Sequence, residues 1–156
     1  MLGAVPERVR DNVLGVDAHR LGYRHGPAFP TLNELVAHLC DAGAAFEAAL
    51  RHGLLEGADE VDLRTALEGL STQDDSTPAA DRLEDLGRQR RRTMDVLRGL
   101  PEEDWEGKIL CDIDFGDFSL LDFCRLVAKH EMSHLSQVRN LTSLLPEPVV
   151  VREARR

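Results

Sequence analysis

The chain has 156 residues, of which 42% are hydrophobic and 30% charged, and this composition predicts a globular domain rather than a disordered segment. Its formal net charge of −9 repels phosphate backbones and therefore disfavours nucleic-acid binding. The longest apolar run is too short to cross a membrane and no charged-then-apolar leader opens the chain, so we expect no membrane partner. We expect a single domain over residues 1–156, with a core of about 5–145 and a tail over 146–156.

The cysteine count indicates the redox compartment, and the abundance of helix-forming residues indicates the fold class. Cys40, Cys111 and Cys124 are odd in number and have no CxxC spacing, which indicates free thiols in a reducing cytoplasm. Aromatic residues are only 4%, whereas Ala, Leu, Glu and Arg are abundant, so the composition favours helices.

The first half of the chain contains two predicted helices. Pro6 suits the first turn of a helix that we expect to end near Leu21. The stretch 22–30 contains two glycines and two prolines and breaks that helix. Thr31 and Glu34 form a capping box, which predicts a second helix from there to about residue 51.

A polar stretch over residues 53–77 separates the second helix from the third. A short helix over about 61–70 is expected inside this long connection. Thr77 followed by Pro78 predicts a helix cap and a first helical residue. The third helix is then expected to end near residues 99–101, a Gly-Leu-Pro sequence.

Residues 101–118 are the least helical part of the second half. Residues 108–118 predict a small hairpin that turns at Gly116. Ser119 is the expected cap of a long fourth helix that ends near Leu145. Four amphipathic helices, with a long connection between the second and the third, predict an all-α four-helix bundle.

Three histidines form the strongest candidate site. His130 and His134 are four residues apart, so both lie on one face of the fourth helix, and a 100° helical count places that face on the apolar stripe. His38 lies at the edge of the inward stripe of the second helix. Three imidazoles that face one core predict a metal site with an open coordination position. The alternative is that each is a hydrogen-bonded core histidine.

The same segment also spells HExxH, the motif of zinc metalloproteases in which Glu131 would be the general base. Such enzymes need a third ligand downstream, and only Glu147 and Glu153 remain there, so we disfavour a protease. Glu131 lies on the other side of the stripe and is a candidate catalytic base or partner of a ligand. The alternative is a structural glutamate paired with an inward cation.

Arg90 is the candidate for that cation, because it falls on the apolar stripe of the third helix. A guanidinium there could instead bind a carboxylate of the substrate. A third interpretation is that its stem packs in the bundle while its head reaches solvent. Cys124 borders the stripe of the fourth helix and is expected in the core.

Three segments together resemble the DinB/YfiT-like family. They are Leu35-Val-Ala-His38-Leu39, Leu100-Pro-Glu-Glu-Asp-Trp105, and 126–137, which contains H-x3-H followed by Gln137. The resemblance covers about residues 5–145. Two departures are Ser136, where the family usually has Gly, and the sequence Phe-Pro-Thr at 29–31, where it commonly has Trp-Ser.

The resemblance implies a four-helix bundle that holds a divalent metal ion through His38, His130 and His134. Zinc and nickel are the expected ions, with iron or manganese as alternatives. Relatives in the family include S-transferases and isomerases that use low-molecular-weight thiols such as bacillithiol or mycothiol. The resemblance also implies a homodimer, and Leu14 and Leu21 lie off the main stripe of the first helix as apolar surface for it.

Three functional hypotheses follow for a small-molecule substrate. The first is a metal-dependent transfer of a thiol to a small electrophile, and the second is a metal-dependent small-molecule hydrolase. The third is a non-catalytic, metal-binding dimeric protein. In the first, Glu131 or Gln137 would steer a proton or the leaving group, and Arg90 would hold an anionic end of the substrate.

Overall fold

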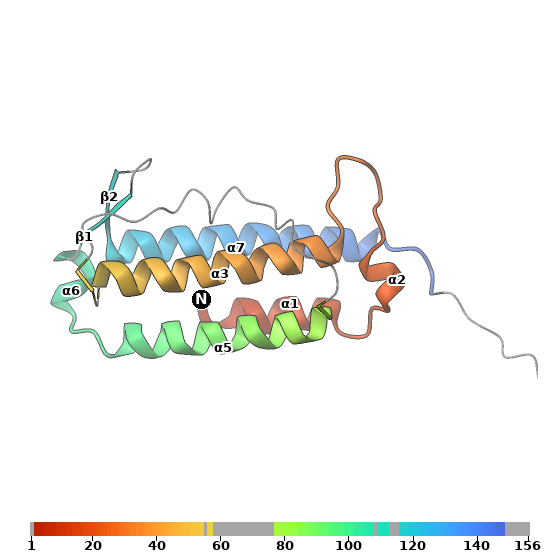
Figure 1. Cartoon of the computed structure of the whole chain (residues 1–156). Helices are drawn as coiled ribbons and strands as arrows, with labels where there is room; N and C mark the ends of the chain where they lie inside the picture. Colours follow the sequence, from red (N-terminus) through yellow and green to blue (C-terminus); the bar gives the residue numbers. More distant parts are fainter. Residues whose placement is uncertain (1, 55, 58–76, 108, 113–115, 149–156) are drawn as a thin grey trace, which may run out of the picture.

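Four helices build the molecule, as predicted, and the fold is an all-α four-helix bundle (Figure 1). The computed structural model describes residues 2–54, 56–57, 77–107, 109–112 and 116–148. The bundle helices are α1 (Val5–Val13), α3 (Leu32–Leu54), α5 (Ala79–Arg98) and α7 (Leu120–Ser143). The shorter elements are η1 (Leu2–Ala4), α2 (Ala18–Leu21), α6 (Glu103–Gly107), β1 (Ile109–Asp112) and β2 (Gly116–Ser119).

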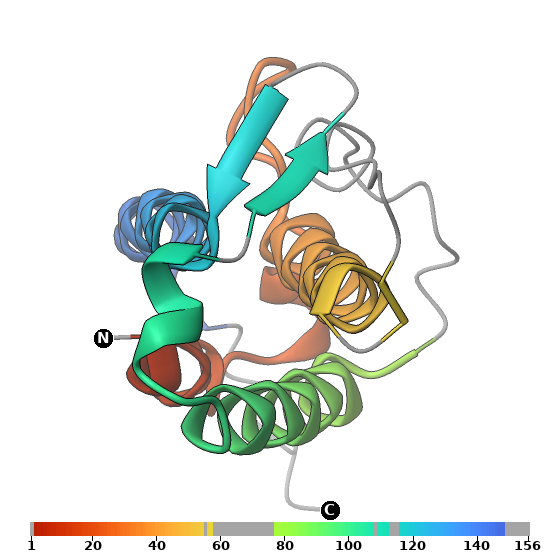
Figure 2. The same cartoon turned by 90° about the vertical axis from the view of Figure 1, so that its left-hand side faces the viewer.

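The four helices form a square when viewed end-on (Figure 2). Helix α3 packs beside α5 and α7, and α1 packs beside the same two helices on the other side. Helices α3 and α5 run in the same direction, opposite to α1 and α7 (Figure 1). The end of α3 and the start of α5 therefore lie at opposite ends of the bundle (Figure 1), separated by the length of a 23-residue helix, about 34 Å. This separation accounts for the long connection that the sequence predicted.

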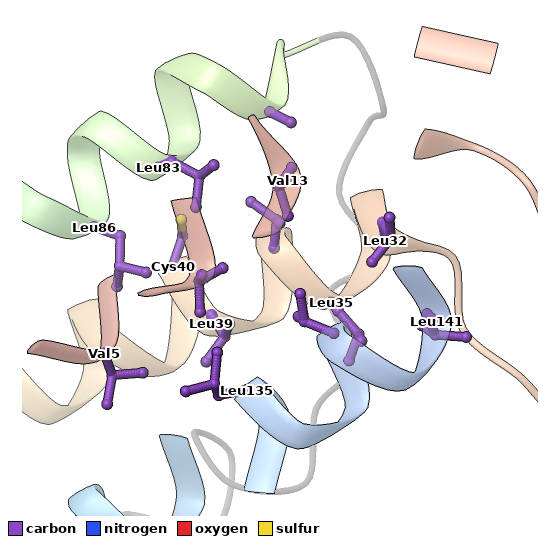
Figure 3. Close-up of a cluster of buried hydrophobic side chains, with 14 residues drawn as sticks. Val5, Val13, Leu32, Leu35, Leu39, Cys40, Leu83, Leu86, Leu135 and Leu141 are labelled. Atoms are coloured by element: carbon purple, nitrogen blue, oxygen red, sulfur yellow. The ribbon is translucent and has the colours of Figure 1, made fainter. Parts of the chain in front are cut away.

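Helix α1 is much shorter than its neighbours, so the core has two parts. With 9 residues it spans about 14 Å, against about 36 Å for the 24 residues of α7. The first core cluster contains residues of all four helices, whereas the second has none from α1. Figure 3 shows the first cluster, with Val5, Val13, Leu32, Leu35, Leu39, Cys40, Leu83, Leu86, Leu135 and Leu141 labelled. The second cluster includes Ala42, Phe46, Leu50, Leu97, Leu120, Phe123, Cys124 and Val127.

The predicted caps of α3 and α7 are both present. The backbone N–H of Glu34 donates to Thr31 Oγ1 at 3.1 Å, and Glu34 Oε2 accepts from the backbone N–H of Thr31 at 2.7 Å. Ser119 Oγ accepts from the backbone N–H of Asp122 at 3.1 Å. Arg24 donates to Phe29 O at 2.6 Å and pairs with Glu34. These bonds tie the loop before α3 to its first turn and so fix where α3 begins.

The prediction of one helix from Pro6 to Leu21 is wrong. Helix α1 ends at Val13, and α2 begins only at Ala18. Asp17 caps α2, because its Oδ1 accepts from the backbone N–H of Arg20 at 2.9 Å. The helix ends in a turn, because Leu14 is already extended with φ −62° and ψ 126°, and Gly15 follows with φ +88°, a left-handed conformation that favours glycine. Leu21 packs against the first cluster, whereas Leu14 is exposed.

Three other boundaries differ in detail. Pro78, not Thr77, is the N-cap of α5, and its carbonyl accepts from Asp81 N at 3.0 Å. The hairpin is antiparallel as predicted, but Gly116 begins β2 and pairs with Asp112 instead of forming the turn. Helix α6 was not predicted, because its five residues show no apolar periodicity. The short helix expected over 61–70 and the tail beyond 148 lie outside the described residues.

Among the described residues, no helix is long and apolar enough to cross a membrane.

Gly15 provides a test of the break between α1 and α2. An alanine there would be forced into a left-handed conformation, which costs roughly 1–2 kcal/mol, although no atom lies within 4 Å of the added Cβ. We expect Gly15→Ala to lower the free energy of unfolding by about that amount in urea titrations. Gly3→Ala is the matched control, because that position is equally open and has no positive φ. Equal stability of the two variants would contradict the assignment.

Candidate metal centre

Three imidazole rings meet where α3 lies against α7. His38 on α3 is 2% exposed, and His130 and His134 on α7 are half-buried. The Nε2 atom of His38 lies 3.2 Å from that of His130 and 3.1 Å from that of His134, and the latter two are 3.1 Å apart. The three residues that the sequence singled out are thus brought together, with their Nε2 atoms at the corners of one small triangle.

Hydrogen bonds alone do not satisfy this triangle. A neutral imidazole Nε2 carries either a proton or a lone pair, so at least one of the three pairs must set two like groups face to face. A divalent ion accepts all three lone pairs at once. Nitrogen ligands at 2.0–2.1 Å in tetrahedral geometry are about 3.3 Å apart, close to the separations found here. This donor set therefore fits a metal ion, and the group could hold one.

Gln137 orients one of the rings. Its Oε1 atom lies 2.8 Å from Nδ1 of His134, one turn away along α7. An amide oxygen can only accept, so His134 carries its proton on Nδ1 and points the Nε2 lone pair into the triangle. Nδ1 of His130 is also buried and has no hydrogen-bond partner within the described part of the chain.

Burial keeps the rings of His130 and His134 neutral. Burial, together with the neighbouring rings of His134 and His38, lowers the pKa of His130 to about 4. Burial also lowers the pKa of His134, although the bond to Gln137 opposes the shift. Only the neutral form of imidazole binds a metal, so both rings are ready to act as ligands at neutral pH.

A buried ion pair lies behind the histidines. Arg90 on α5 pairs through Nη2 with Oε1 of Glu131 on α7, and the two side chains are only 7% and 3% exposed. Helices α5 and α7 are diagonal in the square (Figure 2). The pair therefore crosses the interior of the bundle. The structure thus favours the pairing of Glu131 with an inward cation, and Arg90 is that cation.

The helical count from sequence placed these residues only approximately. It put both histidines on one side of the α7 stripe and Glu131 on the other, whereas the structure buries Glu131 and Leu135 and leaves His130 and His134 half-buried. The stripe is shifted because α7 packs against α1 as well as α3. No periodicity indicated the contact between Phe46 and the His130 ring, whose centroids are 5.5 Å apart.

The protease interpretation gains nothing from the geometry. The third histidine comes from α3, far upstream of the HExxH segment, and not from a residue downstream of it. Glu131, which would be the base of such an enzyme, is instead paired with Arg90.

Comparison with known proteins identifies the family. A family model described as the DinB superfamily matches residues 1–138, and the chain belongs to that superfamily. Among solved structures, YfiT from Bacillus subtilis superposes with a TM-score of 0.75 at 19% identity, covering 91% of this chain and 82% of YfiT. YfiT is described as "a probable metal-dependent hydrolase with an unusual four-helix bundle topology". The search of curated proteins gave no match. The predicted family is confirmed, and so is the fold.

The lowered pKa of His130 predicts how acid affects the metal-free protein. The pKa is about 4 in the folded chain against an ordinary value of 6.5, so the unfolded state takes up the proton first as the pH falls. Stability from this group is complete above pH 6.5 and is lost between pH 6.5 and about 4. We expect urea midpoints of chelator-stripped protein to decline over this window, and to decline less in His130→Gln. Parallel declines in both proteins would contradict the assignment.

The ion pair predicts a strong coupling between α5 and α7. Glu131→Gln leaves the Arg90 charge buried without a counter-charge and should cost roughly 3–5 kcal/mol in the free energy of unfolding. The double variant Arg90→Met with Glu131→Leu removes both charges and should recover most of that loss. The measurement is urea unfolding of the single variants Glu131→Gln and Arg90→Met and of the double variant. A double variant no more stable than the single ones would show that the pair is not coupled.

Proposed function

We propose that this chain is a metal-dependent enzyme that binds one divalent ion, zinc or nickel, through His38, His130 and His134. The observation that supports this most is the convergence of three imidazole Nε2 atoms within 3.2 Å of one another. We further propose that it transfers a low-molecular-weight thiol, of the bacillithiol or mycothiol kind, to a small electrophile. The family resemblance of the sequence supports this reaction.

The chain's own residues set up the reaction. Three protein ligands leave a coordination position open, and a bound ion would lower the pKa of a thiol or water there, supplying a nucleophile at neutral pH. Gln137 is a positioning residue, because it holds the His134 ring in one tautomer and one orientation. The edge of the Phe46 ring contacts His130 and provides an apolar wall beside the site.

Neither Cys40 nor Cys124 is suited to supply the thiol. Burial raises the pKa of Cys40 to about 12 and that of Cys124 to about 11, so both remain protonated at neutral pH. Both side chains are also buried in the core. A small external thiol can instead reach His130 and His134, which are half-buried.

A small-molecule hydrolase is the second candidate. Its support is the description of YfiT as a metal-dependent hydrolase. The same three histidines and the same open position would serve water in place of a thiol.

The metal site predicts the metal content of the purified protein. We expect about one divalent ion per chain, and loss of that ion when His134 is replaced by Ala, since two imidazoles bind far more weakly than three. Metal analysis by mass spectrometry measures this directly. His52→Ala is the matched control, because His52 is exposed and pairs only with Glu56 among the described contacts. Equal metal content in the triple variant His38→Ala, His130→Ala, His134→Ala and in the parent would show that the site is misassigned.

A single probe separates the candidate reactions. With 1-chloro-2,4-dinitrobenzene, a thiol forms a C–S bond, chloride leaves with the C–Cl electrons, and the thiol proton passes to the buffer. Hydrolysis gives the phenol instead. We expect metal-dependent thioether formation with bacillithiol, mycothiol, glutathione or cysteine, detected by mass spectrometry and abolished by chelator. Equal rates in His130→Ala would contradict the mechanism, phenol alone would favour the hydrolase, and no product with bound metal would favour a non-catalytic protein.

A further inference from the structure

A small cavity lies beside the histidines, in the part of the bundle that α1 does not reach. Its volume is about 20 Å³, and residues of α3, α5 and α7 line it. That volume exceeds the roughly 10–15 Å³ that one water requires, but it leaves no room for a bulky ring. Phe46 belongs to both places, because it lines the cavity and its ring contacts His130.

Two polar atoms at this cavity lack a hydrogen-bond partner among the described residues. They are Nε of Arg90, whose side chain is 7% exposed, and Oε1 of Gln89. The first is a donor and the second an acceptor, and a buried polar atom without a partner destabilises the fold unless a ligand or water satisfies it. The remaining lining is mostly apolar and includes Leu86, Phe123 and Val127.

The charge around the cavity selects an uncharged ligand. Glu131 already balances the Arg90 guanidinium, so the pair is neutral as a unit. An anion or a cation placed beside it would be a buried charge without a counter-charge. A group that offers an acceptor and a donor side by side would satisfy both open atoms. A primary carboxamide does so, with its carbonyl on Arg90 and its N–H on Gln89.

We propose that this cavity is the specificity pocket for the uncharged polar end of the substrate, of the primary carboxamide class. The inference rests on the proposed function only in calling the ligand a substrate. Gly43 shapes the pocket, since a Cβ there would lie 3.0 Å from both Gln89 Oε1 and Leu86 Cδ1. Arg90 then binds the uncharged end of the substrate, and not the anionic end expected from the sequence.

The test uses formamide as the probe and metal-free protein, so that it does not depend on metal or turnover. Formamide should cause saturable shifts of the backbone amide NMR signals of Gly43, Thr93 and Cys124. Acetonitrile has a similar size and accepts but cannot donate, so it should bind more weakly. Gln89→Met should weaken the binding of formamide about three- to tenfold, as expected for the loss of one hydrogen bond, and should leave the affinity for acetonitrile unchanged.

Two glycine variants complete the test. Gly43→Ala should weaken the binding of both probes, because the added Cβ enters the pocket wall. Gly87→Ala on α5 is the matched control, since its Cβ meets only Arg91 Nη1 at 3.7 Å, and it should bind both probes like the parent. The proposal is overturned if formamide gives no saturable shift, or if Gln89→Met weakens both probes equally. A protein without metal or turnover that still binds formamide would overturn the proposed function and leave the pocket standing.

Discussion

The close approach of three imidazole rings is the constraint on which the rest of the site depends. Their Nε2 atoms are 3.1–3.2 Å apart, and three neutral rings cannot all be satisfied by hydrogen bonds among themselves, because at least one pair must set two like groups face to face. The bundle must therefore hold α3 against α7 in one register. The capping box at Thr31 and Glu34 fixes where α3 begins, and the Ser119 cap does the same for α7. Beyond these caps, packing between the apolar faces of α3 and α7 holds the three imidazole rings close together.

The short first helix explains why polar groups lie so deep in this bundle. Where α1 is absent, the second core cluster is enclosed mainly by α3, α5 and α7. The ion pair of Arg90 and Glu131 crosses that space diagonally, and the small cavity lies next to it. Phe46 lines the cavity and contacts the His130 ring, so the candidate metal site and the neutral, polar pocket share this residue.

Local sequence chemistry predicted much of this structure, and tertiary packing decided the rest. The caps at Thr31 and Ser119 and the spacing of His130 and His134 are short-range features, so they could be recognised without a fold. The break at Gly15 was missed because a single glycine inside an apolar pattern is often tolerated in a helix. The sequence left the pairing of Arg90 with Glu131 as one of several alternatives. The pairing depends on which two helices face each other across the bundle, and the sequence does not give that. The cavity could not be predicted, because it arises from how three helices fit together.

X-ray absorption spectroscopy of the metal-loaded protein tests the central claim most directly, because it counts the ligands around the ion. The account predicts three imidazole nitrogens at about 2.0–2.1 Å and a fourth ligand that is not from the protein. Addition of a small thiol should then replace the fourth ligand by sulfur at about 2.3 Å for zinc. Fewer than three imidazole ligands around the ion, or a sulfur ligand to the ion before any thiol is added, would contradict the account.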